Sequence, residues 1–467
     1  MPYLRSDLAT AFLLAGAALA VNLCFQTEGC GETDQAQLIL VAAAGRDTGE
    51  WTLGDHYSMR TSPLVLTFLR NRLNAGCSVH ALARRMNTAN GIAGAATIGL
   101  LFLLWCRVAD KRTAIATTLL FFFVPGFWIS CQYGMPHVIS FCLFVASLYC
   151  FSLTKDVYLR WHIAMYSLAT VWMALACMCK ADIILCGGAF GGMLVLQGET
   201  RCRRWLMALM IPAIGILLTL VYSRAVTPNA APVDAFASHW HARYPFALWT
   251  LVEWKQISVN IYVFGKVIFL AVAGSVVVAA REKNRRRALW MALLWSAPQI
   301  VFWGLIYGNS ARHIMAATAP FVFLVANVLY SRTWLSSRQA NLAVVLIIVL
   351  NFFSAGPHPG LRRPSTRLFG SARALQRQID SRRLRGREFV ALARPRKLLL
   401  REDNSAYGVL EVLAHARAYH WQNGTLIVTY GDGRTEQIRR VRPRDLSQKD
   451  LQALMDEGWT VWSMREE

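Results

Sequence analysis

The residues best suited to chemistry are charged side chains that stand at the ends of long apolar runs. Asp34 comes shortly after an apolar run at 8–25, and Lys180 and Arg312 stand at the ends of later runs. An ionised carboxylate can act as a general base, and Lys or Arg can hold a phosphate group. A carboxylate at such a place also serves as a helix cap, and a cation there also reaches ordinary lipid headgroups. The residue types alone leave both uses open.

Three further polar residues stand near the same run ends. Arg60 is a second-rank phosphate candidate, and His313 directly follows Arg312. His137 follows Pro136 at the start of an apolar run, where it can make a polar contact but supplies no carboxylate. A divalent metal stays open, because the acids between 26 and 90 have no spacing that specifies a site. These acids include Glu32, Asp34, Asp47 and Glu50.

The composition is that of a membrane protein. Of the 467 residues, 55% are hydrophobic and 16% are charged, and the mean hydropathy is +0.35. Soluble domains carry about 25% charged residues. The net charge of +22 comes from Lys and Arg in short clusters between apolar runs and in the last quarter of the chain. Because that pattern is typical of cytoplasmic loops and a basic tail, we expect no nucleic-acid partner.

About eleven apolar runs are long enough to suggest membrane spans. Basic residues such as Arg107, Lys155 and Arg203 fall in every second connection, which the positive-inside rule assigns to the cytoplasm. The N-terminus is then cytoplasmic, and an odd number of spans puts the C-terminus outside. The runs lie near 8–25, 91–107, 113–131, 136–153, 162–179, 182–197, 205–224, 258–280, 288–308, 312–331 and 338–354.

Two domains are predicted. Residues 1–354 form the transmembrane module with a first outer loop at 26–90, and 355–467 form a basic, soluble extracytoplasmic domain. Within the second domain we expect a helix at 372–383 and strands at 389–393, 425–430 and 460–464, with a hairpin turn at 431–433. A Cys30–Cys77 disulfide is compatible with an oxidising compartment, and the sequence does not decide it.

The spacing of several short motifs resembles that of a known family. Asp34 is followed by Gly49-Glu50-Trp51 and then by the turn Ser62-Pro63-Leu64 before an apolar helix. The turn at Lys180 and the pair Arg312-His313 come later in the span order. Together they resemble GT-C fold glycosyltransferases, with aminoarabinose lipid A transferases and protein O-mannosyltransferases as the nearest likeness. The resemblance extends over residues 8–354 and implies an all-α polytopic membrane protein with about 11 transmembrane helices and a small C-terminal extracytoplasmic α/β domain.

The resemblance implies an inverting transfer of a sugar from a polyprenyl-phosphate donor to a lipid, glycan or protein acceptor on the extracytoplasmic face. Asp34 is then the general base. Lys180, Arg312 and Arg60 are the residues expected to bind the donor phosphate, and His313 and His137 are expected to contact substrate. The family commonly has an acid where His137 stands and a Lys where Ser62 stands.

Two other classes remain as alternatives. An O-antigen ligase or polymerase also uses Arg and His of outer loops on lipid-phosphate donors, but it carries its large loop late in the chain. A polytopic transporter or flippase is disfavoured by the absence of internal repeats and by the few charges inside the apolar runs. We expect the protein in the bacterial inner membrane, with membrane lipids as its surroundings and no cofactor certain beyond the lipid-linked donor.

Overall fold

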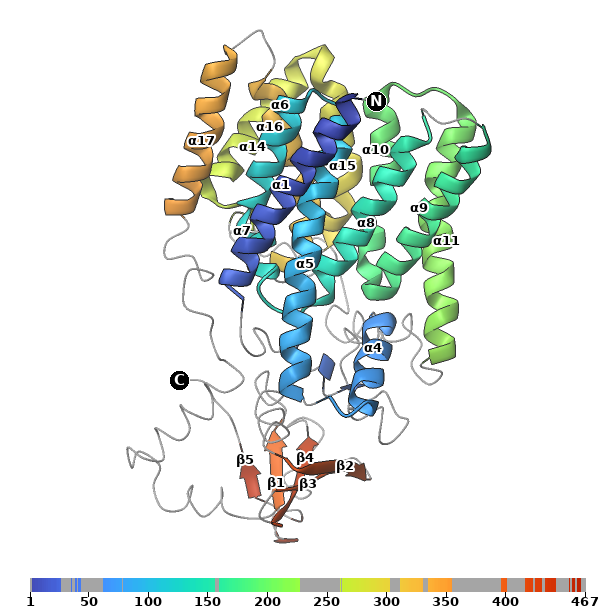
Figure 1. The fold of residues 1–467 in the computed structure, drawn as a ribbon, viewed down its shortest axis with the longest axis vertical. Coiled ribbons are helices and arrows are strands. Elements are labelled where there is room, and N and C mark those ends of the chain that lie inside the picture. Colours follow the sequence, from blue (N-terminus) through green and yellow to red (C-terminus); the bar gives the residue numbers. More distant parts are fainter. Residues whose placement is uncertain are drawn as a thin grey trace.

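Most of the chain is helical, and its helices form one bundle with a small β-sheet near one end (Figure 1). The computed structural model describes residues 2–26, 35, 38–39, 41–42, 62–77, 79–155, 159–226, 261, 263–302, 311–330, 335–354, 396–400, 416–422, 425–430, 433–441, 453, 456–457 and 460–462. The predicted helix at 372–383, the predicted strand at 389–393 and Cys30 lie outside these residues.

The described helices follow the apolar runs of the sequence. Each predicted run overlaps one helix or two helices in succession. In chain order they are α1 (Pro2–Cys24), α4 (Pro63–Asn74), α5 (Val79–Cys106), α6 (Lys111–Phe122), α7 (Pro125–Ser130), α8 (Pro136–Leu153), α9 (Leu159–Cys179), the 3₁₀ helix η1 (Ala181–Cys186), α10 (Gly188–Gln197), α11 (Cys202–Val226), α14 (Lys266–Arg281), η3 (Lys283–Arg285), α15 (Arg286–Gln299), α16 (Ala311–Leu329) and α17 (Ser337–Ser354).

Five of these helices are long and apolar enough to cross a membrane by themselves. They correspond to Ser6–Cys24, Ala81–Cys106, Pro136–Leu153, Trp161–Cys179 and Cys202–Val226, with shorter apolar helices at Ala181–Gln197, His313–Leu329 and Ser337–Phe353. Large apolar side chains face outward, with Phe12 and Phe353 each 75% exposed, as lipid-facing residues do. The chain is therefore a mostly helical polytopic membrane protein, and the number of about eleven spans stays a prediction.

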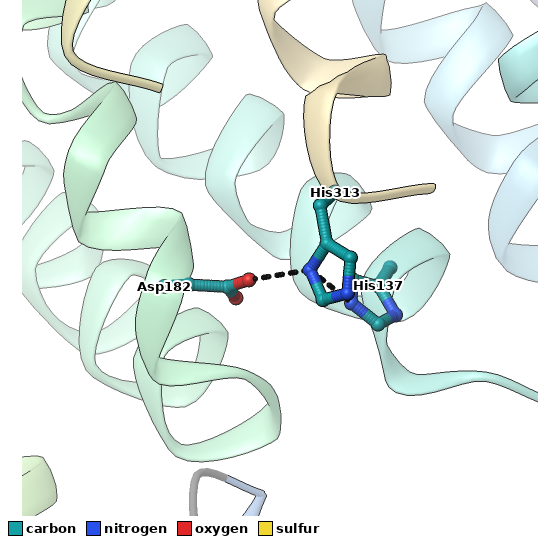
Figure 2. Close-up of side chains that lie close together, drawn as sticks. All are labelled: His137, Asp182 and His313. Atoms are coloured by element: carbon teal, nitrogen blue, oxygen red, sulfur yellow. Dashed lines mark hydrogen bonds and ion pairs between the residues drawn. The ribbon is translucent and has the colours of Figure 1, made fainter. Parts of the chain in front are cut away.

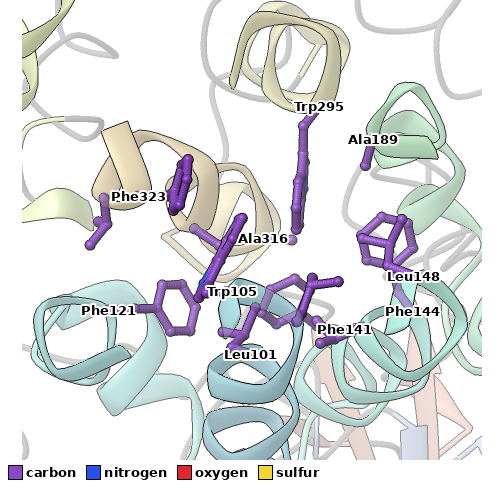
Figure 3. Packing of buried hydrophobic residues seen from close by; sticks show 14 of the residues in the cluster. Leu101, Trp105, Phe121, Phe141, Phe144, Leu148, Ala189, Trp295, Ala316 and Phe323 are labelled. Atoms are coloured by element: carbon purple, nitrogen blue, oxygen red, sulfur yellow. The ribbon is translucent and has the colours of Figure 1, made fainter. Parts of the chain in front are cut away.

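Aromatic rings join four helices in the centre of the bundle (Figure 3). The fully buried Trp105 of α5 stacks on Phe323 of α16 at 4.5 Å and on Trp295 of α15 at 5.9 Å between ring centroids. Trp295 also meets the edge of Phe144 of α8 at 5.7 Å. Such ring pairs stabilise the packing beyond the area they bury. This core fixes α8 and α16, the two helices whose first residues matter below.

The start of α1 and the start of α6 lie together at one end of the bundle (Figure 1). The Lys111 ammonium lies 3.1 Å from the Asp7 carboxylate and donates to the Ser6 hydroxyl at 2.8 Å. The connection between α10 and α11 holds a further ion pair, because Arg204 and Arg201 both donate to Glu199. These contacts involve the basic connections that the sequence assigns to the cytoplasm.

Helix α5 is longer than its apolar run. It begins at Val79, inside the segment 26–90 that the sequence predicts as an outer loop, and it has 28 residues. At 1.5 Å per residue it is about 42 Å long, more than the roughly 30 Å of a hydrocarbon core. The polar residues Asn87 and Asn90 near its start are fully buried in the protein. This extension and α4 supply ordered structure within the predicted loop.

The C-terminal strands form one five-stranded sheet in the order β2-β3-β4-β1-β5. Its antiparallel part is β2 (Ala418–Gln422), β3 (Thr425–Thr429) and β4 (Thr435–Val441), to which β1 (Arg396–Leu400) and β5 (Thr460–Trp462) add in parallel. The predicted strand at 425–430 is confirmed by β3, and the predicted strand at 460–464 is confirmed over Thr460–Trp462. The hairpin between β3 and β4 is confirmed too, with Gly433 at φ +84°, a conformation that favours glycine.

Candidate functional site

Three polar side chains that are far apart in sequence meet where three helices begin. His137 is the second residue of α8, Asp182 lies in the first turn of η1, and His313 is near the start of α16. Pro136 takes the first position of α8, where its fixed φ and missing N–H suit a helix start. The backbone of Lys180 is extended between the end of α9 and η1, so the chain turns there and brings Asp182 inward.

The three side chains are in direct contact (Figure 2). His313 Nδ1 lies 3.1 Å from Asp182 Oδ2 and 3.2 Å from His137 Nε2. The two imidazole rings are perpendicular, with centroids 4.5 Å apart. The side chain of Asp182 is 13% exposed, and both histidines are buried. The three donor atoms lie within 4.8 Å of one another, so they could hold a metal ion.

Lys180 lines the same small pocket. It is 5% exposed, and its neighbours there include Ser140 and Gln299 together with the two histidines and Asp182. The Ser140 hydroxyl donates to the Ala176 carbonyl at 2.9 Å, which holds α8 against the end of α9. A lysine is rarely buried unless an acceptor or an anion compensates its charge. The described residues that line the pocket therefore include one ammonium, one carboxylate and two imidazoles.

A buried amide connects the first predicted outer loop to the turn before α8. Asn87 Oδ1 accepts hydrogen bonds from the Gly134 backbone N–H at 2.6 Å and from the Gln35 side-chain amide at 2.8 Å. A side chain at Gly134 would collide with Met86 and with the Gln35 amide. The glycine therefore permits the close approach. Gln35 directly follows Asp34 in sequence, and Gly134 precedes His137 by three residues.

The same turn packs in an apolar cluster that also includes residues of α4, α5 and β3. Tyr133 and Met135 share this cluster with Leu66 of α4, Leu82 of α5 and Leu426 of β3. The cluster is separate from the aromatic core of the bundle. The pocket thus lies at the end of the bundle nearest to α4 and the sheet, away from the contact between Lys111 and Asp7.

The structure brings together three of the residues predicted from the sequence. Lys180, His137 and His313 line one pocket. Arg312 lies in the first turn of α16, directly before His313, but its side chain lies outside the described residues. Asp34 and Arg60 also lie outside the described residues.

Sequence reasoning missed Asp182 as a site residue. The sequence indicates a turn at Lys180, and it predicts only the lysine of this turn as a site residue. Lys180 is the extended residue before η1 and Asp182 lies in the first turn of η1, and both reach the pocket. The pairing of an acid with a basic residue within a short turn was the available signal. The carboxylate that the family resemblance led us to expect near His137 therefore comes from a different turn.

Comparison with known proteins gives matches only among solved structures. No protein-family model matches the chain, and no curated protein matches it. The archaeal oligosaccharyltransferase AglB from Archaeoglobus fulgidus, in complex with an inhibitory peptide and a dolichol-phosphate, aligns with a TM-score of 0.55 and 13% identity. That alignment covers 87% of this chain and 63% of AglB, so the chain spans less than two thirds of that protein.

ArnT from Cupriavidus metallidurans is a second structural neighbour. Its apo structure aligns with a TM-score of 0.54 and 13% identity over 88% of this chain and 84% of ArnT. Its complex with undecaprenyl phosphate aligns at 0.50 and 14% identity over 89% and 77%. At such low identity the likeness is one of fold. The chain has the fold of the GT-C glycosyltransferases AglB and ArnT. This confirms the GT-C-like fold, whereas the number of spans and the extracytoplasmic position of the sheet stay predictions.

Proposed function

We propose that this protein is an inverting glycosyltransferase that moves a sugar from a polyprenyl-phosphate donor to a lipid, glycan or protein acceptor on the extracytoplasmic face. The observation that carries the proposal is the buried Lys180 in a polar pocket of a GT-C fold. Two of the structural neighbours were solved with a dolichol-phosphate and with undecaprenyl phosphate. The pocket's chemistry suits the same kind of anion.

In this proposal Lys180 binds the phosphate of the donor. As the bond between the sugar's anomeric carbon and the phosphate oxygen breaks, negative charge grows on the departing lipid phosphate. An ammonium in a site of low dielectric stabilises that charge more strongly than it would in water. In our proposal Arg312 and Arg60 add further positive charge, and His313 and His137 contact the substrate.

The acceptor hydroxyl needs a general base, and we assign this role to Asp34. The hydroxyl oxygen attacks the anomeric carbon on the face opposite the phosphate, its proton passes to the Asp34 carboxylate, and the lipid phosphate leaves. One displacement of this kind inverts the configuration. The proposal is supported by the adjacent residue, because Gln35 is fully buried and hydrogen-bonded to Asn87. The same Asn87 oxygen holds Gly134, in the turn that leads to His137.

The orientation in the membrane follows from charge. The basic connections, including Lys111 and Arg204, gather away from the pocket and are assigned to the cytoplasm by the positive-inside rule. The pocket, α4 and the C-terminal sheet are then extracytoplasmic, with the N-terminus in the cytoplasm. Nucleotide sugars are absent on that face, so a lipid-linked donor is the reasonable sugar source.

Binding of undecaprenyl phosphate to the purified protein in lipid nanodiscs tests the donor assignment. Lys180→Ala should weaken binding by about ten-fold or more, the equivalent of roughly 1.4 kcal/mol. Lys155→Ala is the matched control, because Lys155 is exposed in the connection after α8. Equal affinities of the wild type and the Lys180→Ala variant would contradict the proposal.

A further inference from the structure

Two groups compete for a single nitrogen atom in the pocket. Asp182 Oδ2 and His137 Nε2 both face Nδ1 of His313, at 3.1 and 3.2 Å (Figure 2). A proton relay through a histidine uses its two ring nitrogens, one toward each partner. Here one nitrogen meets both partners, and one nitrogen carries either one proton or one lone pair. A chain of hydrogen bonds therefore does not account for the arrangement.

Among the three side chains themselves, neither arrangement of the proton on His313 Nδ1 suits both neighbours. If His313 Nδ1 carries a proton, it can donate a hydrogen bond to Asp182 Oδ2. The lone pair of His137 Nε2 then faces a nitrogen whose proton is already used in that hydrogen bond. If His313 Nδ1 carries a lone pair, it can accept from His137 but opposes a carboxylate oxygen. A cation bound by the three atoms removes the conflict, because each atom can then offer a lone pair to it. His137 then keeps its proton on Nδ1, a buried atom that has no partner among the described residues.

We propose that His137 Nε2, His313 Nδ1 and Asp182 Oδ2 hold a divalent transition-metal ion, and that this ion is Zn²⁺. Two imidazole nitrogens and one carboxylate oxygen are a donor set that suits zinc, whereas Mg²⁺ and Ca²⁺ prefer oxygen ligands. Zinc bonds of about 2.1 Å in a tetrahedron separate the donors by about 3.4 Å. Two of the three separations, 3.1 and 3.2 Å, are already close to that value.

The three elements that carry the donor atoms are packed against one another. The three donors come from α8, η1 and α16, and the aromatic core holds α8 and α16 in place. Donors on packed helices give a site that is formed before the ion arrives.

The charge balance suggests what the ion does. Lys180 lines the same pocket, and Asp182 is the one acid among the described residues that line it. A single carboxylate does not neutralise both an ammonium and a divalent ion. Zinc sites with three protein ligands keep a fourth coordination position open for water or substrate. An anion bound there would neutralise the remaining positive charge. This step rests on the proposed function: the anion is the donor phosphate, held by the ion and Lys180 together.

Zinc binding to the purified full-length protein tests the site without any sugar donor. The protein is stripped with a chelator, dialysed against Zn²⁺ and analysed for metal by mass spectrometry. The wild type should retain about one zinc per chain. His137→Gln and Asp182→Asn should each weaken binding by more than about 100-fold, because even the loss of a partner of a metal ligand costs 10–100-fold. His162→Gln is the matched control, since His162 stacks on Tyr166 of the same helix.

Elution as a single species on size exclusion and an unchanged melting temperature in chelator show that a variant is folded. Asp182→Asn keeps the shape of the side chain, so it serves if His137→Gln does not fold. Zinc retention by Asp182→Asn equal to that of the wild type would overturn the proposed site. A second titration adds undecaprenyl phosphate, which should tighten zinc binding in the wild type. Zinc binding that the lipid phosphate leaves unchanged would sustain the metal site and contradict its role toward the phosphate.

Discussion

Asp182 and His313, 131 residues apart in sequence, meet at 3.1 Å in a pocket that also contains Lys180. The carboxylate comes from the turn after α9, and the imidazole comes from the start of α16. Their contact places an acidic group close to His137, although the residues next to His137 in sequence include no acid. The negative charge of Asp182, which lies in one pocket with Lys180 and two histidines, is therefore the subject of the first prediction.

Asp182→Asn should lower sugar transfer by about ten-fold or more while the protein remains folded. The substitution keeps the size of the side chain and removes the negative charge that lies in the same pocket as the Lys180 ammonium. Lys180 and the two histidines are then no longer held in the arrangement that binds the phosphate. Transfer measured in membranes, with protein amount determined by immunoblot, checks the result. Asp7→Asn is the control, because Asp7 pairs with Lys111 at the opposite end of the bundle. Undiminished transfer by Asp182→Asn would remove this acid from the mechanism.

Asn87 acts as a positioning residue. Asn87→Ala leaves the buried Gly134 N–H and Gln35 amide without their acceptor, at a cost of about 1–3 kcal/mol for each group. We expect the transfer rate to fall more than the donor affinity, because the base and the phosphate site lose their alignment. Asn87→Asp, which keeps an acceptor oxygen, should retain more activity than Asn87→Ala.

The control for this prediction is Asn341→Ala. Asn341 is exposed and accepts only from the Tyr330 hydroxyl among the interactions that the structure describes. A purely structural role of Asn87 would lower the melting temperature without a change in rate per folded molecule. That outcome would contradict its positioning role.

Gly134→Ala should impair the protein far more than the same change in an open position. A side chain there would press on Met86 and on the Gln35 amide, so either the turn or the Asn87 contact must shift. Gly274→Ala is the matched control, since a Cβ at Gly274 meets nothing within 4 Å. The comparison is made by thermal unfolding in detergent and by transfer per folded molecule. Equal behaviour of the two variants would show that the close approach at Gly134 is unimportant.

The ion pairs of Glu199 with Arg201 and Arg204, in the connection between α10 and α11, should make the melting temperature depend on pH. Hydrogen bonds from the side chains of Arg201 and Arg204 lower the pKa of Glu199 far below its ordinary value of 4.5. A carboxyl with a lowered folded-state pKa stabilises the fold above its ordinary pKa, and this stabilisation is lost as the pH falls toward the folded-state pKa. The melting temperature of the wild type should therefore exceed that of Glu199→Gln at pH 7, and the difference should narrow below about pH 4.5.

Melting curves of both proteins across this range provide the measurement. Asp7→Gln, which alters the ion pair with Lys111, is a control for general effects of acid on the bundle. A difference between wild type and Glu199→Gln that stays constant down to pH 3 would contradict the assignment of this stability to the Glu199 carboxylate.

The sequence predicted the helices well where hydropathy and helix-start residues agree. Helix α8 begins at Pro136 and ends at Leu153, within the run predicted at 136–153, because proline favours the first helical position. The extension of α5 to Val79 was not predicted, since its first turns carry polar residues such as Asn87 and hydropathy detects only the part within the bilayer. The break between α6 and α7 at Val124 was missed for the opposite reason, because the whole segment is apolar.

The site could be predicted only in part. Lys180, His137 and His313 were recognisable as polar residues at the ends of apolar runs, a local property. The contact between Asp182 and His313 depends on how α9, η1 and α16 pack, and no pattern in a single sequence encodes a pairing across 131 residues. Asp34, the residue on which the mechanism depends most, lies outside the described residues, so its role is still a proposal.

The most direct test of the central claim is the fate of the lipid-linked sugar in cells that depend on this protein. Cells without the native gene are supplied with the wild type, Asp34→Asn or Lys180→Ala, and their membrane lipids and glycans are analysed by mass spectrometry. The account predicts that both variants insert normally, lose the sugar modification and accumulate the polyprenyl-phosphate sugar. Normal modification with Asp34→Asn, and no accumulated donor, would contradict it.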